Sequence, residues 1–308
     1  MRIIFLGTPD FAVASLKALV EHGFNVVAVV TAPDRPAGRG MKLQSSAVKK
    51  YSDSQGLPLL QPEKLKAPEF LEALRSFQAD LQVVVAFRML PEVVWNMPPL
   101  GTINVHASLL PDYRGAAPIN WAIINREKYS GVTTFKLKQA IDTGNILLQK
   151  KVLIEEEETA GTLHDKLMAE GAKLLIQTLK ELSAGTLKEI EQDATLDSKH
   201  APKLFTETCQ IHWDKTAQDV IAHIRGLSPY PGAFTRLNGK LLKIYQGKVI
   251  MGNPDPKPGK LVSDGKTYLH ICAADAWISV LELQIEGKVK MKVEDFLRGN
   301  KVTETVCE

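Results

Sequence analysis

Hydrophobic runs punctuated by turn signals dominate the first half of the chain. Residues 3–6, 25–31 and 80–87 are rich in consecutive apolar side chains, which is typical of strands that are buried on both faces. Between the first two runs, apolar positions recur at helical spacing, at Phe11, Leu16, Leu19 and Val20. Gly23 then ends the helical pattern. Strand, helix and strand in this order predict a βαβ unit and a Rossmann-like α/β sheet.

The pattern changes after about two thirds of the chain. Residues 187–209 are polar and lack apolar periodicity, as expected for a linker. Beyond them, short alternating runs are separated by hairpin signals at Asn238-Gly239 and Asp264-Gly265. We therefore predict a catalytic α/β domain over residues 1–205 and a small β-barrel, similar to oligonucleotide-binding folds, over residues 206–308.

The amino-acid composition is that of a globular protein without unusual features. The chain has 308 residues, 44% of them hydrophobic and 24% charged, which is ordinary for two globular domains. A net charge of +3 permits a polyanionic partner without arguing for one. Three scattered cysteines suit a reducing compartment. We see neither a signal peptide nor an apolar stretch that could span a membrane, so we expect a cytoplasmic protein and, in the simplest case, a monomer.

The candidate chemistry is concentrated in residues 103–106, where apolar and polar positions alternate. Alternate residues of a strand share a face, so Asn104 and His106 point the same way near the end of this strand. In a parallel sheet, ligands bind beyond the carboxyl ends of strands. The pair could simply be hydrogen-bonded together beneath a loop, but it could also present an amide donor and an acid/base group to one substrate atom.

A carboxylate supports the chemical interpretation. Asp142 follows the strand pattern of residues 131–137, which we expect to lie beside the strand that carries His106. Both residues should then meet at one edge of the sheet. Carboxylates orient imidazoles and stabilise their charged form.

These motifs resemble a known signature. Asn104-x-His106, the run Ser108-Leu109-Leu110-Pro111-x-Tyr113-Arg114-Gly115 and Asp142-Thr143-Gly144 are similar to the folate-dependent formyltransferases. The resemblance implies catalytic roles for Asn104, His106 and Asp142, with 10-formyltetrahydrofolate as co-substrate and no metal. It also implies a folate pocket formed by Ser108, Leu109, Leu110, Pro111, Arg88, Met89 and Leu90.

The sequence of the loop 32–42 indicates which substrate accepts the formyl group. Its Pro-Asp-Arg-Pro-Ala-Gly-Arg-Gly sequence resembles the loop of those family members that formylate initiator methionyl-tRNA for translation initiation. The resemblance implies that Arg35, Arg39 and Lys42 bind the tRNA. Two alternatives remain: a formyltransferase that acts on a sugar nucleotide or another small amine, and a tRNA-binding module without catalysis.

Other site classes lack their sequence signals. The turn Gly7-Thr8-Pro9-Asp10 has no second and third glycine, so it is no dinucleotide fingerprint. The sequence contains neither His-Glu-x-x-His nor paired Cys-x-x-Cys, and no Gly-x-Ser-x-Gly. The remaining histidines are expected to be surface or packing residues.

Overall fold

The computed structural model describes residues 1–37, 41–193, 198–250, 252, 257–300, 302 and 305–307. The chain forms two compact units. The N-terminal unit comprises Met1–Gly115, Ser130–Val152 and His164–His200, and the C-terminal unit comprises Ala116–Tyr129, Leu153–Leu163 and Ala201–Glu308. The division into domains after residue 205 remains a prediction. The compact C-terminal unit also includes two segments, 116–129 and 153–163, that come before this boundary in the sequence.

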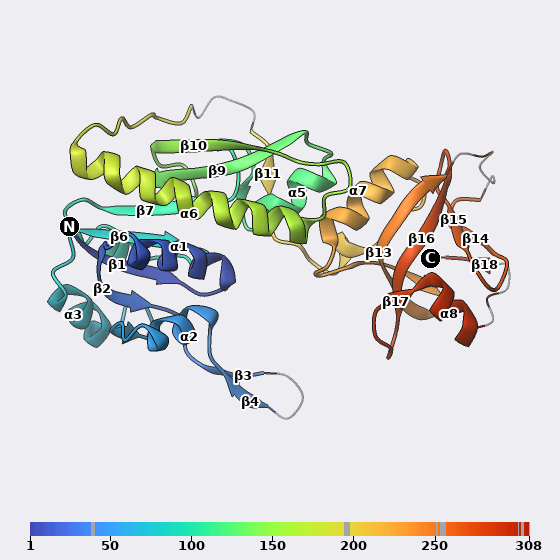
Figure 1. The fold of residues 1–308 in the computed structure, drawn as a ribbon, viewed down its shortest axis with the longest axis horizontal. Coiled ribbons are helices and arrows are strands. Elements are labelled where there is room, and N and C mark those ends of the chain that lie inside the picture. The colour runs from blue at the N-terminus through green and yellow to red at the C-terminus, as the bar shows by residue number, and fades with distance from the viewer. Residues whose placement is uncertain are drawn as a thin grey trace. The chain divides into compact units, whose positions relative to one another are not determined.

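The N-terminal unit is built on a mixed sheet with the order β10-β9-β7-β6-β1-β2-β5 (Figure 1). Its strands are β1 (Arg2–Gly7), β2 (Asn25–Val30), β5 (Leu59–Leu60), β6 (Leu81–Val85), β7 (Thr102–His106), β9 (Tyr129–Lys136) and β10 (Ile146–Leu153). The helices between them are α1 (Asp10–Glu21), α2 (Ala47–Ser54), α3 (Pro68–Ser76) and α4 (Glu92–Trp95), and α6 (Ala160–Ala184) follows β10. Five strands, β1, β2, β5, β6 and β7, run parallel, which confirms the predicted Rossmann-like α/β sheet.

The core explains why the first strand is continuously apolar. Ile3, Ile4, Phe5 and Leu6 are each at most 1% exposed, so both faces of β1 are covered. Burying each such side chain contributes about 1.5–3 kcal/mol relative to leaving it in water. Gly23, with φ of +71°, follows the end of α1 as the sequence predicts.

The direction of β9 is a feature that the sequence does not reveal. β9 lies beside β7, as predicted, but the two strands are antiparallel: His106 pairs with Thr133 and Ile103 with Lys136. Their carboxyl ends therefore lie at opposite ends of the pair. The segment after Lys136 has to turn back along β7 to bring Asp142 to His106.

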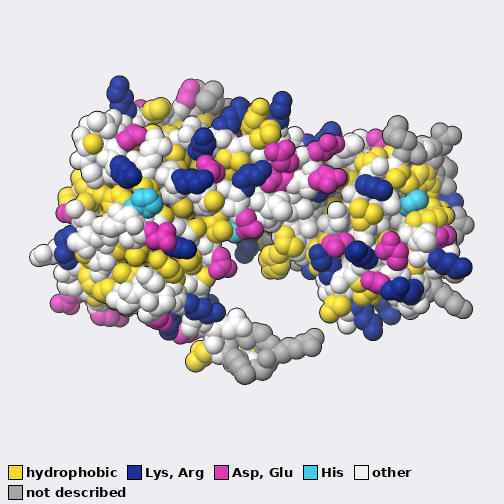
Figure 2. Space-filling model, viewed as in Figure 1, with side chains coloured by type: hydrophobic (Ala, Val, Ile, Leu, Met, Phe, Trp, Pro, Cys, Tyr) yellow, Lys and Arg dark blue, Asp and Glu magenta, His cyan; other side chains and the backbone are white. Residues whose placement is uncertain are grey.

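The loop 32–42 contains a hairpin that the sequence did not predict. β3 (Arg35–Ala37) and β4 (Lys42–Gln44) pair antiparallel, with Arg35 opposite Gln44. The prolines and glycines of this loop hide the strand pattern in the sequence. Pro36 is nevertheless compatible with pairing, because both strands of a two-stranded hairpin are edge strands. The hairpin extends away from the sheet of its unit, as the ribbon and the space-filling view show (Figure 1, Figure 2).

The C-terminal unit contains an antiparallel half-barrel, which confirms the predicted small β domain. The sheet order is β12-β13-β16-β15-β14-β18, with β17 paired to β16. Its strands are β12 (Ala233–Leu237), β13 (Lys240–Ile250), β14 (Lys260–Ser263), β15 (Leu269–Cys272), β16 (Trp277–Ile285), β17 (Met291–Lys292) and β18 (Thr305–Val306). The turn between β12 and β13 is the predicted one, with Asn238 and Gly239 at φ of 51° and 76°.

Helices complete the C-terminal unit. They are α5 (Pro118–Ile124), the 3-10 helix η1 (Glu207–Cys209), α7 (Ala217–Leu227) and α8 (Val293–Gly299). Helix α7 places Val220, Ile224 and Leu227 into the apolar core of the half-barrel. Two short strands, β8 (Arg114–Gly115) and β11 (His200–Ala201), pair with each other. Within the described ranges, no helix has the length and apolar character needed to cross a membrane.

Candidate functional site

Strand β7 presents Asn104 and His106 on one face, as the alternation predicts. The imidazole of His106 is almost fully buried, with the residue 8% exposed. It meets the ring of Phe135 edge to face, with the centroids 6.4 Å apart. Packing against β9 therefore fixes the plane of the imidazole.

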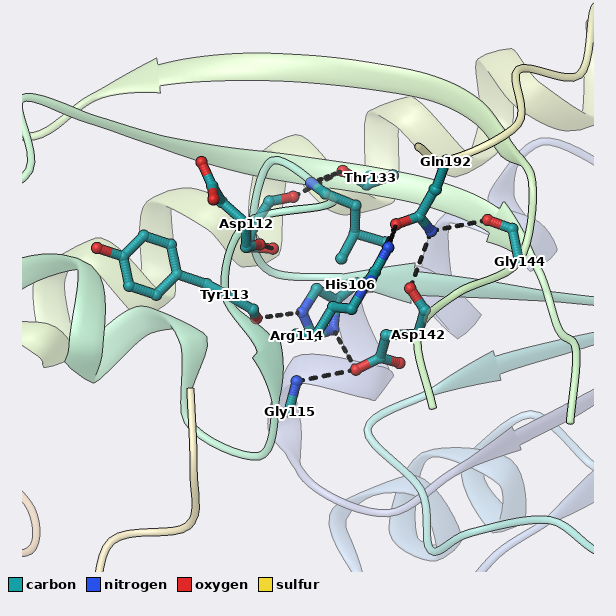
Figure 3. Close-up of polar contacts among 11 residues, drawn as sticks. His106, Asp112, Tyr113, Arg114, Gly115, Thr133, Asp142, Gly144 and Gln192 are labelled. Carbon is teal, nitrogen blue, oxygen red and sulfur yellow. Dashed lines mark hydrogen bonds and ion pairs between the residues drawn. The ribbon is translucent and has the colours of Figure 1, made fainter. Parts of the chain in front are cut away.

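Two contacts define which nitrogen of His106 can react (Figure 3). Nε2 lies 2.9 Å from the carbonyl oxygen of Tyr113. A carbonyl only accepts hydrogen bonds, so Nε2 carries the hydrogen and Nδ1 is the basic nitrogen of the neutral ring. Nδ1 lies 3.9 Å from Oδ2 of Asp142. A proton taken up by Nδ1 would therefore form an imidazolium beside a carboxylate.

Asp142 is itself held by the backbone. Its Oδ2 accepts a hydrogen bond of 3.0 Å from the N–H of Gly115, and its own φ is +54°. A Cβ added at Gly144 would collide with the carbonyl of Lys136, so only glycine allows the turn to return this closely along β9. The structure thus brings His106 and Asp142 together, and strand β7 carries Asn104 two residues before His106.

Gln192 is a site residue that the sequence analysis missed (Figure 3). The residue is 7% exposed, and its amide nitrogen donates to the carbonyl oxygens of Asp142 at 2.8 Å and Gly144 at 2.7 Å. Its amide oxygen accepts from Nη2 of Arg114 at 2.6 Å. Gln192 lies in the polar stretch that resembles a linker, so no local sequence signal marks it.

The side-chain amide of Asn104 is unusual because it has no hydrogen bond to any residue in the described part of the chain. Its Oδ1 is buried without a partner. Buried polar atoms are normally paired, so an unpaired acceptor oxygen is typical of a group that pairs with a ligand, and the NH2 group of the same amide is its donor. A substrate carbonyl could accept a hydrogen bond from this amide.

Hydrogen bonds from β9 and β10 hold the backbone of the predicted folate segment 108–111 in place. The hydroxyl of Thr133 donates to the carbonyl of Ser108 at 2.7 Å and accepts from the N–H of Leu110 at 3.2 Å. The amide of Gln149 donates to the carbonyl of Leu110 at 2.8 Å. The side chains of Ser108 and Leu110 are buried, whereas Leu109 and Pro111 are half-buried. This segment would contribute its backbone and these two half-buried side chains to a ligand.

The other predicted folate residues occupy three different environments. The guanidinium of Arg88 donates to the carbonyls of Pro62 and Glu63, so it braces the neighbouring loop. Met89 is 74% exposed. Leu90 belongs to the apolar core of the N-terminal unit.

The predicted tRNA-binding residues lie in or beside the β3–β4 hairpin. Arg35 is exposed at the start of β3. Lys42 begins β4, and Arg39 lies outside the described residues. An ion pair of 2.6 Å between Lys49 and Asp34 anchors the base of the hairpin, and the bonded ammonium lowers the pKa of that carboxyl from its usual value.

Metal ligation finds no support in the described ranges. Within them, no three His, Cys, Asp or Glu side chains are grouped as a metal ion would require.

Comparisons with known proteins agree along the whole chain. The formyl transferase family model matches residues 1–179, and the model of the formyl transferase C-terminal domain matches residues 203–301. The methionyl-tRNA formyltransferase of Bacteroides fragilis is 50% identical over 99% of this chain and 96% of its own. That of Flavobacterium johnsoniae is 48% identical over 97% of this chain and 96% of its own.

Solved structures share the fold at low identity. WlaRD, a sugar 3N-formyl transferase crystallised with dTDP and 5-N-formyl-THF, is similar with a TM-score of 0.68 and 18% identity, over 94% of this chain and 99% of that one. HypX from Aquifex aeolicus in complex with tetrahydrofolic acid is similar with a TM-score of 0.66 and 18% identity, over 99% of this chain and 50% of that one. Both structures contain a folate, which fits a folate-dependent family.

Proposed function

Because the chain belongs to the methionyl-tRNA formyltransferases of the formyl transferase family, we propose that it takes its formyl group from 10-formyltetrahydrofolate and that Asn104, His106 and Asp142 carry out the transfer. The acceptor is methionyl-tRNA, as in the close relatives, and the reaction serves translation initiation. The observation that carries the assignment of roles is the buried His106–Asp142 pair beside an unpaired amide.

The acceptor amine can attack without strong activation. The pKa of an α-amino group is roughly 7.7–8.0, and esterification of the carboxyl group to tRNA lowers this pKa further. A substantial fraction of the amine is therefore neutral and nucleophilic near pH 7. The protein has to stabilise the charge that develops and to move one proton.

Asn104 is proposed to stabilise the developing charge. The folate supplies the formyl group, whose carbonyl oxygen becomes negative when the amine adds to the formyl carbon. The side-chain NH2 group of Asn104 is the donor in this step, while its Oδ1, buried without a partner among the described residues, can accept from a donor group of the substrate. One such donor is worth about 2.7–4 kcal/mol in other enzymes.

His106 is proposed to move the proton. As the new C–N bond forms, Nδ1 takes one proton from the amine, while Nε2 keeps its hydrogen bond to Tyr113. The same proton passes to the folate nitrogen when the old C–N bond breaks, so the imidazole ends neutral. Asp142 stabilises the imidazolium between these two steps. No covalent intermediate with the protein is needed.

The residues near this centre fit a folate. The unpaired Oδ1 of Asn104 can accept a hydrogen bond from an N–H group of the folate, and Leu109 and Pro111 are half-buried apolar residues of segment 108–111. We propose that segment 108–111, together with the loop that carries Arg88, Met89 and Leu90, lines the folate pocket.

The tRNA is proposed to contact cations of the hairpin. Arg35 stands exposed at its base, and Arg39 and Lys42 follow it in the sequence. Phosphate contacts of this kind position an RNA without reading its sequence. Residues 206–308 are proposed to form a tRNA-binding domain that contacts the tRNA in addition to the hairpin. The protein is proposed to act as a monomer.

Incubation with labelled 10-formyltetrahydrofolate tests this proposal. Methionyl-tRNA should be formylated, and a dTDP-amino sugar offered in parallel should not. Formylation of the sugar alone would instead support the small-amine alternative. The Asn104→Ala variant should bind methionyl-tRNA normally but lose activity, whereas tRNA binding without turnover in the unchanged chain would support the non-catalytic module.

A further inference from the structure

A cavity lies within the C-terminal unit, built by the end of α5, the segment 210–215 and the first turns of α7. Its volume is about 440 Å³. Ligand pockets usually measure about 300–1,000 Å³, so a small molecule or one residue of a polymer would fit. None of the predicted catalytic, folate-binding or hairpin residues lines it.

The walls of this cavity are held in place by backbone bonds. The N–H of Ile211 donates to the carbonyl of Phe234 at 2.7 Å, and Gln210 forms a β-bridge with the same residue. On the opposite side, Arg126 and Asp219 form an ion pair of 3.1 Å that joins the end of α5 to α7. The cavity is therefore largely formed before any ligand arrives.

Three kinds of chemistry meet in the lining. The apolar lining residues are Ile124, Ile211 and Val220, of which Ile211 and Val220 also belong to the core of the half-barrel. Side-chain amides come from Asn125 and Gln210. Positive charge comes from Arg126 and Lys215, with the exposed imidazole of His212 beside them.

The charge balance of the lining favours an anion. Among the described residues, Asp219 is the only acidic one that lines the cavity, and its carboxylate is already bonded to the hydroxyl of Thr216 and to Arg126, which lower its pKa. Burial lowers the pKa of His223, so this lining imidazole stays neutral near pH 7. Lys215 and the remaining N–H groups of Arg126 thus leave a positive edge on the cavity.

We propose that this cavity binds one nucleotide. The apolar lining would contact the flat base, the amide of Gln210 would bond its edge, and Lys215 with Arg126 would hold its phosphate. The nucleotide is either free in solution or an unpaired nucleotide of an RNA. The RNA source rests on the proposed function, since methionyl-tRNA is then the natural RNA partner.

Two binding measurements on the full chain distinguish the sources. AMP binding is measured by calorimetry, and methionyl-tRNA binding by fluorescence anisotropy at several salt concentrations. Both are measured for the unchanged chain, Lys215→Ala and Gln210→Ala. Each variant should bind the true ligand about tenfold more weakly than the unchanged chain does. For RNA, Lys215→Ala should also flatten the salt dependence by about 0.7 units, as expected for one lost contact to a single strand.

The control is Lys180→Ala, which removes an exposed cation from α6 in the N-terminal unit, away from the proposed tRNA-binding residues. AMP binding that both cavity variants weaken assigns a free nucleotide. No AMP binding, with tRNA binding weakened by the cavity variants alone, assigns an RNA nucleotide. Unchanged binding in both variants, or an equal loss in Lys180→Ala, overturns the proposal. Because binding is measured without formyl transfer, a failure of the proposed catalytic function would be seen separately.

Discussion

Replacing Asp142 with Asn isolates the charge of one side chain. Its Oδ2 both accepts from the N–H of Gly115 and faces Nδ1 of His106. The amide oxygen of Asn can take this position and keep the hydrogen bond to Gly115, because an N–H group there would meet another donor. The variant should therefore keep the geometry of the site and lose only the negative charge.

The distance between the two groups sets the size of the effect. Two unit charges 3.9 Å apart attract by about 1 kcal/mol in water and by about 4 kcal/mol at the effective dielectric constant of a protein surface. The side chains of His106 and Asp142 are only 9% and 12% exposed, so the larger value is closer. We expect kcat to fall about a hundredfold, which corresponds to about 2.7 kcal/mol.

Single-turnover formylation of methionyl-tRNA measures the chemical step directly. Thermal unfolding should show little change, because the Gly115 contact survives. The matched control is Asp112→Asn, whose carboxylate accepts from the N–H of Lys199 in the same region, and it should keep normal turnover. A normal kcat for Asp142→Asn would remove Asp142 from the mechanism, and a large loss of thermal stability would make its role structural.

Three further predictions follow from other contacts. Gln192→Leu removes both hydrogen bonds to the Asp142 turn, so kcat should fall about tenfold. It should fall little further when combined with Asp142→Asn, and additive losses in this double-mutant cycle would show an independent role. Arg35→Ala should raise KM for methionyl-tRNA and leave KM for the folate unchanged, because it removes a phosphate contact; steady-state kinetics with equal losses for both would contradict this. His223 has a folded-state pKa below its usual value because it is buried, so the unfolded chain binds protons more readily and stability falls as pH drops below about 6.5. His223→Gln should flatten the fall in Tm between pH 7 and pH 5, and an unchanged slope would refute this reasoning.

The sequence predicted those features that depend on local periodicity. Alternation along residues 103–106 placed Asn104 and His106 on one face of a strand, and the structure has them there. The apolar run 3–6 predicted a doubly covered strand, which the burial of β1 confirms. The hairpin at Asn238-Gly239 followed from the φ angles that these residues readily adopt.

Features that depend on distant partners were not predictable. Nothing within residues 131–137 reveals that β9 runs against β7, because alternation is the same in both directions. Gln192 acts through bonds to residues about fifty positions earlier, and its own neighbourhood is that of a polar linker. The β3–β4 hairpin is too short to produce a periodic pattern.

The way in which the two units are interleaved along the chain bears on how this protein can be engineered. The C-terminal unit is assembled from 116–129, 153–163 and 201–308, so its first segment is synthesised long before its last. A chimera that exchanges only the residues after 200 between two relatives would combine a new α7 with an old α5. The Arg126–Asp219 and Asn120–Gly226 contacts would then join residues of different parentage. Exchanges should therefore carry all three segments together, and a ribosome-bound chain should complete this unit only after its final strands emerge.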